Sequence, residues 1–283
     1  MCVSLVNGRF FHKLSLAAIL DRPQMDNILP GIETLLFCDE SKFYINDGDF
    51  EDAIYYFAVS VEKRKVPDVN REFKAILAKH KVQFDVYHST TAFKKSRPRP
   101  DLMNDLVQLI IQNRLNCFCY KYSKSLFFEP TKHLTKFNND IISFKKVEFQ
   151  ALFYFLTILN TYVRDFVPNL LKREISMYFD RNVYGVSDIE AFKFPSEDFV
   201  LKQMTFTEKS LISLLSLPDF LGYIFRNSKK SQNKVQFGDK SIEVSNLVIN
   251  SYKGLADINT AGLFRFIDVD KNILGKALQI DIE

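Results

Sequence analysis

The sequence has no tryptophan, only four cysteines and no uninterrupted apolar run long enough to cross a bilayer. The cysteines show neither a CxxC spacing nor a cluster with histidine, so we expect reduced, buried thiols rather than a zinc site or a disulfide framework. Cys117 and Cys119 would share one face of a strand, where close neighbours bridge poorly. The longest apolar run covers residues 151–159, about half of what a transmembrane helix needs.

Targeting signals and common nucleotide-binding motifs are also missing. Residues 1–20 carry Arg9, His12 and Lys13 among apolar residues and lack a cleavage site, unlike a signal peptide. With the short apolar runs, this predicts a cytoplasmic protein that does not contact membranes. There is no P-loop, no Rossmann glycine pattern and no Gly-x-Ser-x-Gly, so nucleotide hydrolysis by those routes and serine hydrolase chemistry have no support.

The composition is that of a globular protein with a large core. The chain has 283 residues, of which 47% are hydrophobic, enough for one large domain or two small ones. Charge is nearly balanced, with 38 Lys and Arg against 34 Asp and Glu, so a polyanionic partner is permitted but not required. We expect an N-terminal extension over residues 1–30, an α/β domain over 31–228 and an appendage over 229–283 packed on that domain.

Apolar patterning predicts a mixed sheet covered by helices. Residues 34–41 form a continuous apolar run that ends in acids, typical of a central strand, and residues 53–61 form a second strand of a hairpin. The later expected elements are a helix capped by Asp68, strand 82–86, a helix from Asp101, strand 117–122, helix 146–166, strand 175–179, strand 199–206, a helix from Ser216 and a linker at 227–233.

Three aspartates stand where such elements end or begin. Asp39, followed by Glu40, comes at the end of the expected central strand, where a carboxylate is costly unless it is solvated, paired or bound to a metal. Ligands of open α/β sheets gather at the carboxyl ends of strands, although Asp39 could also cap a loop or pair with a lysine. Asp180 ends a later strand, and Asp219 opens a helix, where it could simply complement the helix dipole.

Together these acids could hold divalent cations. Mg²⁺ prefers carboxylate oxygens and retained water. Two such ions about 4 Å apart can activate water and stabilise the leaving oxygen of an in-line displacement. We therefore expect the carboxylates of Asp39, Asp180 and Asp219 to cluster.

Three segments resemble, in order and spacing, a bacterial family catalogued as domain of unknown function 3800, which looks like a branch of the RNase H-like superfamily. LFCDES (residues 36–41) is similar to its Asp-Glu-Ser-Gly opening. ISMYFDR (175–181) is similar to its apolar strand ending in Asp-Arg. LLSLPDFLGY (214–223) is similar to its Leu-Gln-Leu-Ala-Asp-Leu-Leu-Ala helix start. The resemblance covers residues 35–226.

The resemblance implies an α/β, RNase H-like mixed sheet of five or more strands flanked by helices, with Mg²⁺ or Mn²⁺ as cofactor. It implies Asp39, Asp180 and Asp219 as catalytic residues. The metal ligands would be these three and Glu40. Residues expected to support the ligands or contact substrate are Arg181, Glu208, His88, Lys94, Lys95, Arg97 and Arg99. From the residues alone, a lone histidine near a strand end such as His88 is more typical of a hydrogen-bonded structural residue, and the basic residues are at least as typical of a solvated loop.

The sequence also departs from the family pattern. Lys42 stands at the usual Gly, and Ser216 and Pro218 replace the Gln and Ala of the third segment. The family often has Glu-x-His near the third strand; here His88 matches, but Val86 stands at the Glu position, with Asp85 beside it. These departures keep an alternative open.

The sequence therefore predicts a divalent-metal-dependent nuclease or a related phosphodiester-processing enzyme. The alternative is a catalytically inactive RNase H-like module that binds nucleic acid or a protein partner, in a defence or mobile-element context. RNA and DNA substrates are not distinguished by the sequence, and neither is the oligomeric state.

Overall fold

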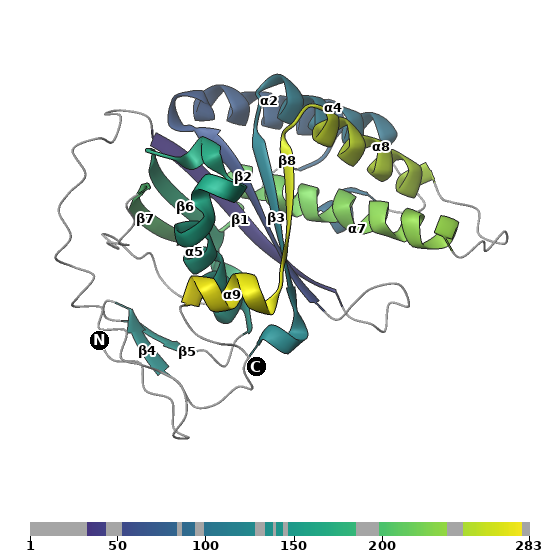
Figure 1. Ribbon diagram of the computed structural model, residues 1–283. Coiled ribbons are helices and arrows are strands. Elements are labelled where there is room, and N and C mark those ends of the chain that lie inside the picture. The colour runs from purple at the N-terminus through teal and green to yellow at the C-terminus, as the bar shows by residue number, and fades with distance from the viewer. Residues whose placement is uncertain are drawn as a thin grey trace.

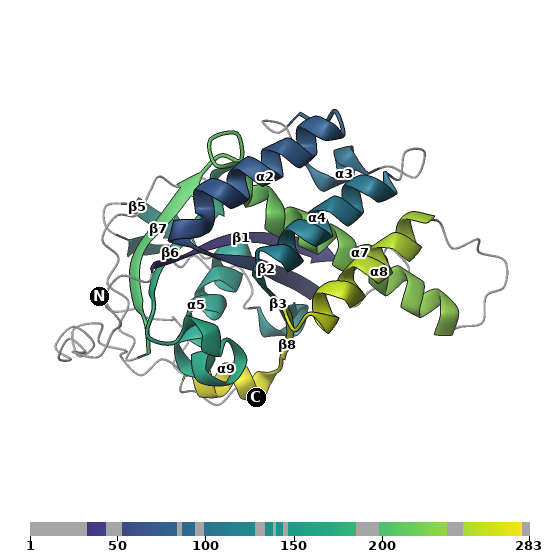
Figure 2. The same ribbon diagram turned by 90° about the horizontal axis from the view of Figure 1, so that it is seen from above.

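A computed structural model describes residues 33–43, 53–83, 87–93, 99–127, 134–137, 140–143, 147–184, 198–236 and 246–278. These residues form a six-stranded mixed sheet with helices on both faces (Figures 1 and 2). The predicted α/β class is thus confirmed. Within the described ranges, every helix is too short or too polar to span a membrane.

The sheet is built around an antiparallel hairpin, and its order is β7-β6-β1-β2-β3-β8. β2 pairs antiparallel with both β1 and β3, whereas β6 runs parallel to β1, β7 parallel to β6, and β8 parallel to β3. The strands are β1 (Glu33–Phe43), β2 (Ala53–Glu62), β3 (Asn116–Ser123), β6 (Glu174–Asp180), β7 (Val200–Thr207) and β8 (Phe264–Val269).

Alternation along the strands assigns side chains to two layers. On β1, Leu36 and Cys38 face one side, and Leu35 and Phe37 face the other. The first side, here called the α5 face, is covered by α5 (Val147–Phe166) and α9 (Lys271–Leu278). The second, the α7 face, is covered by α2 (Val66–Lys79), α4 (Pro100–Gln112), α7 (Ser216–Gln236) and α8 (Asn246–Thr260), as Figure 2 shows from above.

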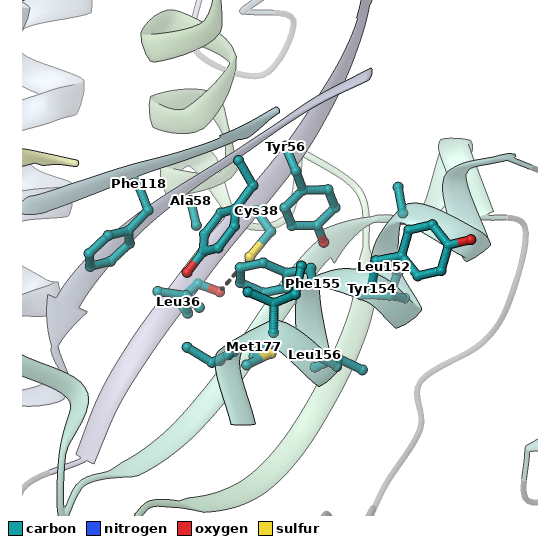
Figure 3. Packing of buried hydrophobic residues seen from close by; sticks show 14 of the residues in the cluster. Leu36, Cys38, Tyr56, Ala58, Phe118, Leu152, Tyr154, Phe155, Leu156 and Met177 are labelled. Atoms are coloured by element: carbon teal, nitrogen blue, oxygen red, sulfur yellow. Dashed lines mark hydrogen bonds between the residues drawn. The ribbon is translucent and has the colours of Figure 1, made fainter. Parts of the chain in front are cut away.

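Aromatic rings dominate the core on the α5 face (Figure 3). The rings of Tyr56 and Phe155 stack with centroids 4.6 Å apart, and Tyr120 meets the same Phe155 ring edge-on at 5.1 Å. The Cys38 thiol lies beside them and donates to the Leu36 carbonyl at 3.8 Å. These buried contacts fix α5 on the central strands β1, β2 and β3.

The remaining elements are short. β4 and β5 pair as a separate two-stranded hairpin. The short elements are η2 (Lys63–Lys65), α3 (Ser89–Ala92), η3 (Lys124–Leu126), β4 (Leu134–Phe137), β5 (Asp140–Ser143), η4 (Pro168–Leu170), α6 (Arg181–Tyr184) and η5 (Ser213–Leu215).

Most expected elements are found close to their predicted bounds. The β1–β2 hairpin, β3, α5, β6 and β7 are confirmed. α2 and α4 begin at Val66 and Pro100, each with proline at the start, so Asp68 and Asp101 lie inside their first turns. Acids in a first turn still complement the helix dipole.

The strand expected at residues 82–86 is not seen in its described part. Val82, Gln83 and Tyr87 lie outside any strand, and residues 84–86 lie outside the described ranges. The chain here ends α2 instead: Lys81 adopts a left-handed conformation (φ 55°), and Val82 N–H donates to the Leu77 carbonyl at 2.8 Å. That pattern is a common helix C-cap.

The linker expected at residues 227–233 is wrong, because α7 continues through it to Gln236. Asn227 and Ser228 are buried there, and their side chains bond back to the Tyr223 and Phe225 carbonyls. Bonding to the preceding helical turn satisfies polar groups that otherwise favour loops. The expected domain boundary at residue 228 therefore falls inside a helix.

The segment after α7 contributes to all three layers. α8 packs on α7 and α4, β8 extends the sheet beside β3, and α9 packs on α5. Residues 246–278 thus complete the sheet edge and both helical layers (Figure 1).

Candidate functional site

Asp39 lies inside β1 rather than at its end, which corrects the sequence prediction. β1 continues to Phe43 and stays paired with β2 throughout, but its parallel pairing with β6 ends at Cys38 opposite Phe179. Asp39 is therefore the first β1 residue beyond that parallel ladder. The strand that ends beside Asp39 is β6, whose last residue is Asp180.

Strand alternation brings Asp39 and Asp180 to the same face. Asp39 follows Leu35 and Phe37, and Asp180 follows Tyr178, all of which contact the α7-face core. The two aspartates are also neighbours across the β1–β6 junction, each one position beyond the Cys38–Phe179 pair. Adjacent parallel strands thus deliver two carboxylates to one edge.

A lysine that the sequence analysis missed lies between these carboxylates. Lys209 Nζ donates to Asp39 Oδ2 at 3.0 Å and forms an ion pair with Asp180 Oδ2 at 3.8 Å. All three side chains are at most 12% exposed. Lys209 lies in the turn just after β7, whose last residue Thr207 is opposite Asp180 in the sheet.

Asp219 joins the group from the first turn of α7. Its Oδ2 accepts the Ser89 backbone N–H at 2.9 Å, which ties it to the start of α3. Its charge acts on both Asp39 and Lys209. Asp39, Asp180, Asp219 and Lys209 are called the aspartate–lysine cluster below.

The electrostatics of the cluster are dominated by burial and by an excess of carboxylates. Burial raises the pKa of Asp39 to about 7, and repulsion from Asp219 and Asp180 adds to this, while Lys209 opposes it. Burial favours the neutral form of Lys209, but attraction by the three aspartates outweighs it and raises the pKa of the lysine. The ammonium therefore stays charged and offsets only part of the negative charge.

Glu40 is not part of this cluster, because it points to the α5 face. Its Oε2 accepts the Tyr184 hydroxyl at 3.2 Å. Burial raises the pKa of Glu40 to about 8, and the charges of Asp39 and, more weakly, Glu148 on α5 contribute. Of the four expected metal ligands, the structure brings three to one face and leaves Glu40 on the other.

The other expected site residues lie at the margins. His88 is exposed and precedes α3, Arg181 is exposed at the start of α6, and Glu208 accepts the Ser210 hydroxyl on the surface. Arg99 precedes α4 in a left-handed conformation. Outside the described residues or side chains lie Lys42, Asp85, Val86, Lys94, Lys95 and Arg97.

The described cysteines are buried and free. Cys38, Cys117 and Cys119 form no disulfide, and burial raises the pKa of each thiol. The Cys117 thiol donates to the Leu115 carbonyl at 3.6 Å. These thiols pack as small apolar groups, which gives them no part in the cluster.

The side chains of the cluster are of the type that binds divalent cations. Three carboxylates offer hard oxygen ligands, and the single ammonium leaves them with excess negative charge. Across the described ranges, however, no three His, Cys, Asp or Glu side chains are already arranged around a common metal position. The comparisons with known proteins add no relative: no family model, curated protein or solved structure matches the chain.

Proposed function

We propose that the chain is a divalent-metal-dependent nuclease, or a related phosphodiester-processing enzyme, of RNase H-like fold. The observation that carries this is the aspartate–lysine cluster, in which aspartates from three separate segments of the chain meet on one face. Each aspartate belongs to one of the three segments that resemble the bacterial family. Interactions at helix starts account for Asp219 alone, and burying the charges of Asp39 and Asp180 is costly unless they are paired or bound to a metal.

The arrangement of the sheet supports the fold part of the proposal. A hairpin carries the first aspartate, and the strand that bears the second runs parallel to β1 at its side. The third aspartate opens a helix that packs on β1 and β2. An RNase H-like mixed sheet needs at least these parts, and β8 then adds a further edge strand.

The chemistry would divide between the cation and the protein. Bound Mg²⁺ or Mn²⁺ lowers the pKa of a water and stabilises negative charge on phosphate oxygens. Asp39 and Asp219 approach the cluster from the sheet and from α7, so they are the residues that would hold the cation. Asp180 and Asp39 orient Lys209, whose ammonium supplies positive charge close to where a phosphate would bind.

One observation favours the alternative, a module that binds nucleic acid or a protein without cleaving it. Lys209 already neutralises part of the aspartate group, and Val86 replaces the family's Glu. If Lys209 only balances the negative charge of the aspartates in an inactive site, the protein needs no divalent cation.

The two functions are separated by an assay of the wild type, Asp39→Asn and Asp219→Asn on RNA, DNA and hybrid substrates with Mg²⁺ or Mn²⁺. Both variants keep the shape of the side chain but remove charge, so we expect them to fold while cleavage falls by orders of magnitude. In thermal melts, Mn²⁺ should raise the melting temperature of the wild type but not that of these two variants. The exposed Asp268 on β8, which pairs with Lys121 on β3, offers the control Asp268→Asn.

Absence of wild-type cleavage across the panel, together with no Mn²⁺-dependent change in melting temperature, would reject the enzyme and favour the binding module. Cleavage that persists in both variants would assign the activity to another site or to a contaminant.

A further inference from the structure

We propose that Tyr184 is a positioning residue, whose hydrogen bond with Glu40 on the α5 face fixes Asp39 relative to Asp180 on the α7 face. Neither Tyr184 nor Glu40 belongs to the aspartate–lysine cluster, so their contact acts through the strands that carry the two aspartates. The consequence for cleavage rests on the proposed function, whereas the consequence for the geometry of the cluster does not.

The sheet does not pair the two aspartates with each other. The parallel pairing of β1 with β6 ends at Cys38 opposite Phe179, and both aspartates lie one position beyond that pair. Beyond this point β1 pairs with β2 alone among the strands that the structure describes. On the α7 face, Lys209 joins Asp39 to Asp180 through contacts of 3.0 Å and 3.8 Å. A second contact on the opposite face would fix this junction from both sides.

The hydrogen bond between Tyr184 and Glu40 lies at this junction. The chain passes directly from Asp180, the last residue of β6, into α6, and Tyr184 is the last residue of that helix. The Tyr184 hydroxyl donates to Glu40 Oε2 at 3.2 Å, and Glu40 follows Asp39 in β1. The bond therefore connects the residue directly after one aspartate with the end of the helix that follows the other.

The Tyr184 ring is held in place by three other rings. Its centroid lies 5.2 Å from that of Phe149 on α5, 5.7 Å from that of Phe179 on β6 and 5.2 Å from that of Phe206 on β7, and each pair meets edge-on. Tyr184 is only 2% exposed. Because a closely packed ring moves only if its neighbours move, the hydroxyl offers β1 a fixed hydrogen-bond donor.

Ring packing alone does not require the hydroxyl of Tyr184, since phenylalanine would make the same ring contacts. A buried hydroxyl costs free energy unless it is hydrogen-bonded, and burial also makes the charged form of Glu40 costly. Polar groups that are buried as a bonded pair favour one arrangement of the segments that carry them. The segments fixed in this way are the end of β6 with α6 and the part of β1 beyond the parallel pairing.

The test is the NMR signal of the Lys209 ammonium in the whole chain labelled with ¹⁵N-lysine. An ammonium buried between carboxylates exchanges its protons slowly with water, so it should give a resolved signal, which Lys209→Arg identifies by its loss. Tyr184→Phe keeps the ring and removes the hydroxyl. We expect this variant to shift or broaden the signal, because Asp39 no longer keeps its position relative to Asp180.

Two further variants serve as controls. Tyr154→Phe also removes a buried hydroxyl from the α5 face, but one that donates to the Leu126 carbonyl at 2.7 Å. It should lower the melting temperature as Tyr184→Phe does, yet leave the Lys209 signal unchanged. Glu40→Gln keeps an acceptor oxygen for the Tyr184 hydroxyl, so the signal should stay in place there too.

Cleavage provides a second measurement if the wild type is active. Tyr184→Phe should then lower kcat about tenfold or more with little change in KM, because a small displacement of the reacting groups weakens mainly the transition state. Tyr154→Phe should leave both constants near those of the wild type.

The outcomes are distinct. An unchanged Lys209 signal in Tyr184→Phe, shown to be folded by circular dichroism, would overturn the inference. An equal change in Tyr154→Phe would overturn it as well, since it would indicate a general loosening of the core. Loss of the signal in Glu40→Gln would assign the effect to the charge of Glu40 instead of the hydrogen bond.

The wild type itself tests the premises. If it gives no slowly exchanging Lys209 signal, the geometry of the cluster is wrong and the inference fails with it. If it cleaves no nucleic acid, the proposed function fails, but the NMR comparison of the variants still decides whether Tyr184 positions the aspartates.

Discussion

At the scale of single residues, Glu40 shows how one step along a strand changes the role of an acid. Asp39 and Glu40 are neighbours in the sequence, but alternation sends Asp39 to the cluster and Glu40 into the α5 face beside Tyr184 and Glu148. Burial on that face makes the charged form of Glu40 costly.

This placement predicts a pH dependence of stability. Burial, followed by repulsion from Asp39, raises the pKa of Glu40 from 4.5 to about 8, so between these pH values the folded chain holds a proton that the unfolded chain has released. The stability contributed by this proton is complete below pH 4.5 and is lost as the pH rises to about 8. Glu40→Gln, a neutral mimic, should therefore show a flatter decline.

The measurement is urea unfolding at a series of pH values across that window, with a chelator present so that no metal contributes. Asp39 also titrates within this pH window. The free energy of unfolding should therefore fall with pH in both the wild type and Glu40→Gln, but by less in the variant. Parallel pH profiles for the two proteins would contradict the assigned environment of Glu40.

At the scale of elements, α7 lies close to the sheet because it carries Gly222. A Cβ atom at this position would lie 3.0 Å from two ring carbons of Phe57 on β2. Phe57 is 1% exposed, and its ring contacts Tyr55 and Phe225, so it has little room to move. The same helix positions Asp219, so its distance from the sheet matters to the cluster.

Gly222→Ala should therefore destabilise the protein, even though alanine is the better helix former. Overpacking costs about 1–3 kcal/mol, against about 1 kcal/mol gained from helix propensity, so we expect a net loss of roughly 1 kcal/mol in the free energy of unfolding. Chemical denaturation measures the loss. In a Phe57→Leu background the same substitution should cost less, and an equal cost in both backgrounds would refute the contact as its cause.

The sequence predicts those parts of the site that depend on local patterns, and it misses those that depend on contacts between distant segments. Strand alternation and short local patterns suffice to nominate Asp39, Asp180 and Asp219. Lys209 could not be nominated in this way, because its position depends on Thr207 lying opposite Asp180 in the β6–β7 register. The remaining signal, a lysine just after a buried strand, is common in exposed loops.

The same reasoning explains the errors in the predicted elements. The polar stretch after Arg226 is helical because α8 covers it, and α8 lies beyond it in the sequence. The sequence does not predict β8. Its burial does not alternate regularly, because the neighbouring residues Arg265 and Phe266 are both exposed. Elements stabilised mainly by distant partners carry weak local signals.

At the scale of the whole molecule, residues 246–278 are needed to complete the core. They bury apolar side chains on both faces of the sheet, namely Leu247, Ile258, Leu263, Phe264, Ile267, Val269, Leu274 and Leu278. Burying such a side chain contributes about 1.5–3 kcal/mol, so their sum reaches the total stability of a typical domain, about 5–15 kcal/mol.

Removal of residues 246–283 should therefore prevent cooperative folding, and the rest of the chain should not fold without them. We expect the shortened chain to aggregate or to lose its sigmoidal thermal transition, as measured by size-exclusion chromatography and circular dichroism. A monomeric truncated protein that melts cooperatively near the wild-type temperature would show instead that the segment is dispensable.

The pairing of β3 with β8 has a further consequence for how the protein is made. Lys121 and Asp268, which form an ion pair across these strands, are 147 positions apart in the chain. At a translation rate of roughly 5–20 residues per second, β3 would wait for its neighbour for about 7–30 seconds. During that time the free N–H and C=O groups of β3 are open to pairing with other nascent chains. We therefore expect the unfinished chain to be more prone to aggregation until β8 has been synthesised.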